Sequence, residues 1–212
     1  MTTTTHFDSP AGLERMLAMG MEQGMTEAMG QMDAVLADLA SFAAGDSTTT
    51  QLLSDTQVRI SRIIRGGLEA VWRAHHEPAL LPQWLLGPDG WTMPVCEVAT
   101  EVGHRYRYEW AQTDTDRRFG FTGMLLESLP PHRSVTTETM IGAEGPSSTN
   151  ELTLTAVEKG TLLSILITFP DAEIRDNVLA TGMTDGMETS YARLESLISW
   201  GPPGGVRNSD RA

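Results

Sequence analysis

The sequence predicts an α+β protein, in which one continuous segment forms an antiparallel sheet and an amphipathic helix follows it. Six successive segments between residues 93 and 169 alternate polar and apolar residues, and direct succession of strands favours an antiparallel meander over parallel βαβ units. Residues 7–36 also recur without gaps as residues 169–198, and both copies place apolar residues at helical spacing. One copy can bury its apolar face on the sheet, so the other needs a separate partner.

The N-terminal copy is expected to form a helix from Ser9-Pro10 to about Phe42, because serine caps free amides and proline is tolerated in the first helical turn. The polar, threonine-rich residues that follow predict a linker. The chain therefore divides into an N-terminal helical extension (residues 1–42), a linker (43–55), a main domain (56–200) and a loose tail rich in glycine and proline (201–212).

The main domain is predicted to begin with a strand over Val58 to Ile64, where β-branched residues alternate with polar ones. Gly66-Gly67 ends it, and Leu68 to His76 has the apolar spacing of a short helix that stops before Pro78. A second helical turn is expected over Leu80 to Leu85. The strands of the meander are then predicted at residues 93–100, 104–112, 118–127, 134–140, 151–157 and 162–169, and the closing helix over the second copy of the repeat.

Composition narrows the classes of function. The chain has 212 residues, 40% of them hydrophobic, which suffices for one domain with an appendage. Its formal net charge of -13 repels nucleic acids and anionic membrane surfaces, so neither is an expected partner. The single cysteine, Cys96, cannot form an internal disulfide, and no secretion signal or membrane-spanning apolar run is present. These features predict a soluble cytoplasmic protein.

Specific residues resemble those of the START-like superfamily, also called SRPBCC. The segment Ile63 to Ala74, with Val71-Trp72, resembles the strand and helix opening of that superfamily, and Pro82-Gln83-Trp84 resembles its second-helix tryptophan. Thr168-Phe169-Pro170 resembles the entry to its closing helix. The branch that includes the activator of heat-shock protein 90 ATPase is the most similar. The resemblance implies a helix-grip fold, in which a curved sheet wraps a long C-terminal helix and leaves a cavity between them.

Alternation along the segment from His104 to Trp110 indicates which side chains face that cavity. Tyr106, Tyr108 and Trp110 share one face of this strand, and Arg105, Arg107 and Glu109 share the other. We expect the aromatic face to point inward, since aromatic walls with a few hydroxyl and indole donors are typical of small-molecule pockets. Rings at such spacing can equally fill a core. The predicted ligand-binding residues are Trp84, Tyr106, Tyr108, Trp110, Phe119, Phe121, Met183, Met187 and Tyr191.

The sequence contains little that indicates catalysis or metal binding. The histidines at positions 75, 76, 104 and 132 lack partners at metal-ligand spacing, so no metal site, cofactor or catalytic residue is predicted. Cys96 is expected to be a buried, inert thiol. A buried carboxylate would have to be Glu97, Glu109 or Glu138, each flanked by apolar or aromatic residues, and alternation places Glu109 opposite the aromatic face.

Three functions remain open at this point. The first is non-catalytic binding of a small apolar or aromatic ligand in the cavity. The resemblance implies two alternatives, namely a co-chaperone-like activator of a chaperone ATPase and a polyketide cyclase or aromatase-like enzyme. For the N-terminal helix we expect burial against a second subunit, giving a homodimer, or against the outer face of its own domain, because an isolated amphipathic helix is marginally stable in water.

Overall fold

The computed structural model describes residues 9–11, 14 and 47–199, with two compact units divided between Gly45 and Asp46. The predicted N-terminal helix and the C-terminal tail lie outside these described residues, apart from the first turn at residues 9–11 and 14. Within the second unit the expected order of elements is observed. It contains β1 Thr49–Leu52, β2 Gln57–Ile64, α3 Leu68–His76, α4 Leu81–Trp84, β3 Trp91–Glu97, β4 Arg105–Gln112, β5 Arg118–Leu129, β6 Arg133–Met140, β7 Ser148–Val157, β8 Gly160–Thr168, α5 Ala172–Ala180 and α6 Met183–Ser199.

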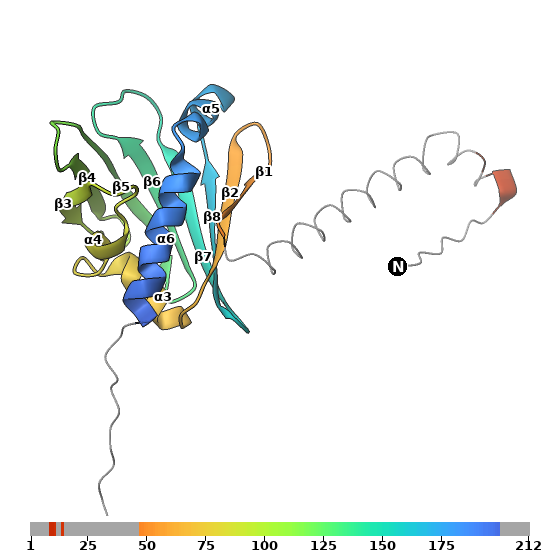
Figure 1. Ribbon diagram of the computed structural model, residues 1–212. Helices are drawn as coiled ribbons and strands as arrows, with labels where there is room; N and C mark the ends of the chain where they lie inside the picture. The colour runs from red at the N-terminus through yellow and green to blue at the C-terminus, as the bar shows by residue number, and fades with distance from the viewer. Residues whose placement is uncertain (1–8, 12–13, 15–46, 200–212) are drawn as a thin grey trace, which may run out of the picture. The chain divides into compact units, whose positions relative to one another are not determined.

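The strands form one eight-stranded antiparallel sheet in the order β1-β2-β8-β7-β6-β5-β4-β3. The meander from β3 to β8 is confirmed, and β2 joins it by pairing with the last strand, so that Ile60 lies opposite Ile165. Figure 1 shows α6 lying across one face of this curved sheet, with α3 and α4 near its C-terminal half. The α+β class and the helix-grip arrangement are therefore confirmed.

Strand β1 corrects the predicted linker. Residues 49–52, expected to be irregular, pair with β2 and extend the sheet at its edge. The sequence Thr49-Thr50-Gln51-Leu52 is polar, but an edge strand that is exposed on one side needs little apolar surface, and threonine is a good strand residue. The side chains of this segment also contact α6: Thr48 donates to Glu188 from both its backbone N–H and its hydroxyl, each at 2.7 Å.

The closing segment forms two helices where one continuous helix was expected. Asp171 caps α5 by accepting a hydrogen bond from the Ile174 N–H at 2.8 Å, and α5 ends at Ala180. Gly182 then adopts a positive φ of 77°, which reverses the helical path before α6 begins. The break lets α5 pack on the end of β2 and β8 while α6 crosses the sheet.

The core lies between the sheet and α6. Its central cluster joins the two short helices, the inner face of β2, β7 and β8, and α6, through Ile64, Val71, Trp72, Ala74, Leu81, Trp84, Leu154, Leu163, Tyr191 and Leu194. A second cluster of Val58, Ile60, Ile167 and Phe169 is covered by α5 and the start of α6. Ala99, Tyr106 and Leu125 form a third cluster, at β4 and β5. The face of the sheet that carries these residues is called the inner face below.

Candidate ligand site

The aromatic residues of β4 lie on the inner face, as alternation predicts. Tyr106 and Trp110 are buried and Tyr108 is partly buried, whereas Arg105 and Arg107 of the same strand are exposed. The neighbouring strand continues this surface, because Phe121 pairs with Tyr108 and Phe119 pairs with Trp110. The inner face of β4 and β5 is therefore an aromatic wall.

The rings of this wall pack against one another in a continuous chain. Trp110 stacks on Phe119 with ring centroids 5.0 Å apart, and Phe119 meets Phe121 edge to face at 5.9 Å. The Trp110 indole N–H donates to the Leu85 carbonyl at 2.7 Å, which fixes the ring against the end of α4. Trp91, which was not among the predicted residues, extends the chain by an edge contact with Phe119. These contacts hold the wall rigid.

Trp84 and Tyr191 lie in the central core and not on an accessible surface. Trp84 is 1% exposed and Tyr191 2% exposed. The Trp84 indole N–H donates to the Ala74 carbonyl at 2.9 Å, and its ring lies 5.9 Å from that of Tyr191. Both rings thus pack α3, α4 and α6 together, and a ligand could touch them only if the core opened.

The two methionines of α6 have different surroundings. Met183 packs in the second cluster with residues of α5, away from the aromatic wall. Met187 contacts both the central and the second clusters and is partly exposed. The structure therefore brings together the five predicted residues of β4 and β5, and separately Trp84 with Tyr191, while Met183 stands apart from both groups.

Some side chains on the inner face are only partly buried. Tyr108, Leu152, Ile165 and Met187 all pack against the central cluster, yet each keeps part of its surface accessible to solvent. In a tightly packed interior, residues at such positions would be fully buried. These four residues, called the open inner surface below, come from β4, β7, β8 and α6. Leu152 and Ile165 were not among the predicted ligand-binding residues, although alternation within the predicted strands indicates which face of the sheet they share.

A polar cluster borders the open inner surface. The Tyr106 hydroxyl donates to the Thr137 carbonyl at 2.9 Å and lies 3.4 Å from Glu138 Oε2. Burial raises the pKa of the Glu138 carboxyl, and hydrogen bonds from Asn150 and Tyr106 partly oppose that rise. Burial also raises the pKa of Tyr108, with further contributions from Cys96 and Glu138. The hydroxyl groups here can donate hydrogen bonds to an oxygen atom of a ligand, and the Glu138 carboxyl oxygens can accept them.

Among the three candidate carboxylates, Glu138 is partly buried on the inner face, and its position raises its pKa. Glu97 is exposed, and Glu109 lies on the opposite face, where the Arg107 Nε–H donates to its carboxylate at 2.6 Å. Asn150 shares the inner face because it pairs with Thr136 of β6 and Ile167 of β8. Its side-chain oxygen is buried without a hydrogen-bond partner among the residues that the structure describes. Nothing in the local sequence around Asn150 signalled this position.

A buried arginine ties the inner face to α6. Arg62 of β2 is 3% exposed and forms ion pairs with Glu188 and Glu195, the second at 3.4 Å. Its Nε atom has no hydrogen-bond partner within the described part of the chain. The sequence did carry a signal, because Arg62 shares the strand face of Ile60 and Ile64, where an apolar residue is expected. This ion pair fixes where α6 crosses the sheet.

Within residues 9–11, 14 and 47–199, no group of three or more histidine, cysteine, aspartate or glutamate side chains could hold a metal ion. None of the helices described there is long and apolar enough to cross a membrane.

Comparison with known proteins identifies the family. The family model described as Activator of Hsp90 ATPase homolog 1-like protein matches residues 67–199. A solved protein from Rhodobacter sphaeroides is 31% identical, covers 74% of this chain and 100% of its own, and has a TM-score of 0.69. One from Chromobacterium violaceum is 27% identical, covers 68% of this chain and 98% of its own, and has a TM-score of 0.58.

An AHSA1-like protein from Aeromonas hydrophila is 19% identical and supports the fold alone, with coverage of 66% of this chain and 93% of its own and a TM-score of 0.56. No curated protein matches the chain. Since the family model covers more than half of the sequence and the Rhodobacter sphaeroides protein is matched over its whole length, the chain belongs to the Activator of Hsp90 ATPase homolog 1-like family within the START-like, or SRPBCC, superfamily.

Proposed function

We propose that this protein binds a small apolar or aromatic ligand, without catalysing its conversion, between the sheet and α6. The observation that supports this most strongly is the open inner surface, where Tyr108, Leu152, Ile165 and Met187 are partly exposed although they pack against the core. Apolar area that stays accessible in a concave setting gains about 25 cal/mol for each Å² that a ligand removes from water.

The surroundings of this surface define the ligand further. The rigid aromatic wall of β4 and β5 favours a flat or aromatic molecule, because rings stack in offset or edge-to-face arrangements at little entropic cost. The cluster of Tyr106, Tyr108, Glu138 and Asn150 offers a few polar contacts at one side. A flat apolar ligand with one or two oxygen atoms fits this combination.

The test is a titration with an uncharged fluorescent probe, N-phenyl-naphthylamine, whose emission rises in apolar surroundings. Wild-type protein should bind it saturably. Leu152→Phe adds bulk at the open inner surface, so it should abolish binding and leave the melting temperature nearly unchanged. The matched control is Leu126→Phe, because Leu126 is 41% exposed and belongs to none of the three core clusters. If Leu152→Phe lowers the melting temperature sharply, the surface is packed and the proposal fails.

A second candidate function rests on the family description. Activation of a chaperone ATPase is the activity that this description names, and a protein-binding role would need no ligand at all. Purified chaperone, assayed for ATP hydrolysis with increasing amounts of this protein, tests it directly. Stimulation that Leu152→Phe leaves unchanged would favour the co-chaperone role over ligand binding.

A further inference from the structure

The ladder between strands β5 and β6 lacks direct pairs at one place. Thr122 pairs with Thr139, and Leu125 pairs with Thr136, but the residues between these pairs do not pair directly. Side chains replace the missing backbone hydrogen bonds, since the Met124 N–H donates to the Thr137 hydroxyl at 3.0 Å. The Thr137 carbonyl accepts from the Tyr106 hydroxyl. Gly123 permits this arrangement, because a Cβ atom there would lie 1.8 Å from the Thr137 carbonyl oxygen.

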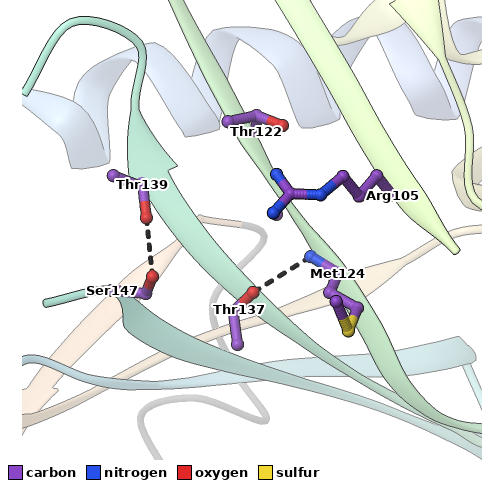
Figure 2. A pocket seen from close by; sticks show the side chains of 7 residues that line it. Arg105, Thr122, Met124, Thr137, Thr139 and Ser147 are labelled. Atoms are coloured by element: carbon purple, nitrogen blue, oxygen red, sulfur yellow. Dashed lines mark hydrogen bonds between the residues drawn. The ribbon is translucent and has the colours of Figure 1, made fainter. Parts of the chain in front are cut away.

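A hollow lies beside these residues on the outer face, opposite α6. Its volume is about 120 Å³, enough for a group of a few heavy atoms, since a water molecule occupies roughly 30 Å³ in the liquid. Figure 2 shows the Arg105 side chain extending from β4 toward β5, with its guanidinium over the hollow. The lining residues are Arg105, Thr122, Gly123, Met124, Thr137, Thr139 and Ser147.

This hollow, called the outer hollow below, is lined by several hydrogen-bond donors without acceptors among the described residues, whereas the Thr122 hydroxyl already donates to the Tyr106 carbonyl at 2.8 Å. Arg105 forms no ion pair with any described residue, in contrast to Arg107 of the same strand, which binds Glu109. The Thr137 oxygen accepts from Met124, so its own hydrogen is free to donate. Thr139 and Ser147 share a hydrogen bond of 2.6 Å, in which one hydroxyl donates and the other keeps its hydrogen free.

The charge of the lining favours an anion over a neutral molecule. No carboxylate lines the outer hollow, although the chain as a whole carries a formal charge of -13. A guanidinium presents several donors in a plane that matches the oxygens of phosphate or carboxylate groups, and hydroxyl groups complete such sites. We propose that the outer hollow binds a small oxyanion, held by the Arg105 guanidinium and the hydroxyl groups of β6 and Ser147.

The experiment is an NMR titration of the full-length protein with inorganic phosphate at constant ionic strength, in which the amide signal of Met124 is followed. The site predicts a saturable shift. Arg105→Gln should weaken binding by about tenfold or more, because a hydrogen bond to a charged group contributes at least about 1.4 kcal/mol, the equivalent of tenfold. Arg105 is exposed and lacks an ion partner among the described residues, so the variant should fold normally.

Arg118→Gln is the matched control. Arg118 is exposed and alternates onto the same outer face of β5, but it does not line the outer hollow, so this variant loses the same charge and should bind phosphate as the wild type does. Thr139→Val should weaken binding without any change in charge. A parallel titration with acetate distinguishes a phosphate ligand from a carboxylate ligand. Saturation by acetate alone supports the site and shows that its ligand is a carboxylate. Non-saturable shifts with both anions, or equal losses in Arg105→Gln and Arg118→Gln, would overturn the proposal.

Discussion

At the scale of single residues, Arg62 makes the least replaceable contact of the domain. It is buried between two carboxylates of α6, so removing it takes the cation from Glu188 and leaves Glu195 with only the more exposed Arg65 at 3.8 Å. Breaking a buried pair typically costs 3–5 kcal/mol, and because Glu188 is 39% exposed we expect Arg62→Ala to lower the free energy of unfolding by about 2–4 kcal/mol. Urea denaturation measures this loss.

The control for that experiment is Arg133→Ala. Arg133 bridges Glu127 and Glu151 across β5, β6 and β7, but all three side chains are substantially exposed. Exposed ion pairs contribute about 0–1 kcal/mol, so the loss should stay below about 1 kcal/mol. Equal losses in the two variants would show that Arg62 does not anchor α6.

His75 predicts a specific dependence of stability on pH. Burial lowers its pKa to about 4 from the ordinary histidine value of 6.5, although a hydrogen bond to the Val71 carbonyl partly opposes this. The unfolded chain therefore binds a proton at higher pH than the folded chain does, and stability is lost as the pH falls from about 6.5 toward 4. At pH 5 the loss from this residue should be about 2 kcal/mol.

His75→Asn isolates that contribution, because asparagine keeps a side-chain N–H donor but has no titrating group. The free energy of unfolding, measured at pH 7 and pH 5, should fall by about 2 kcal/mol less in the variant than in the wild type. His76, whose pKa burial also lowers, is retained in both proteins and cancels in the comparison. An identical fall in the two proteins would show that His75 is not protonated on unfolding.

At the scale of elements, the two glycines near the start of α6 should respond to alanine in opposite directions. Gly182 has a φ of 77°, a conformation that costs an L residue roughly 1–2 kcal/mol, so Gly182→Ala should destabilise the protein by about that amount. Gly186 lies inside α6, and a Cβ there would meet Pro88 at 3.8 Å, an ordinary contact. Gly186→Ala should stabilise by about 0.5–1 kcal/mol, and melting temperatures would reveal either sign.

The sequence predicted the elements well where periodicity was the deciding property. Helix α3 has the predicted bounds, and β4 has its aromatic face inward. The sequence did not predict β1, because this strand pairs through backbone hydrogen bonds that no side-chain pattern encodes. It also did not predict the end of α5 at Gly182, because the apolar spacing continues across that break.

The candidate site was predicted less completely than the fold. Alternation places a side chain on a face, but whether it is covered depends on the path of α6, which local sequence does not determine. Trp84 and Tyr191 therefore proved to be core residues, while Leu152 and Ile165 remain partly exposed. Glu138 and Asn150 come together from different strands, and their contact follows from the register of β6 and β7.

At the scale of the whole molecule, the N-terminal copy of the closing helix stays a prediction. We propose that residues 7–36 bury their apolar face against a second subunit, since the duplicated pattern matches a segment that packs on a sheet. Deleting residues 1–46 should convert the dimer to a monomer, so the molecular mass measured by light scattering should fall to less than half. A mass that falls only by the deleted segment would contradict a role in assembly.

The most direct test of ligand binding is methyl NMR with the uncharged probe N-phenyl-naphthylamine. Leu152, Ile165 and Met187 should shift as probe is added, because their methyl groups line the open inner surface. Leu129 and Met140, which are 58% and 48% exposed, serve as references outside that surface and should not move. Shifts at these exposed residues, with Leu152, Ile165 and Met187 unchanged, would contradict a ligand site between the sheet and α6.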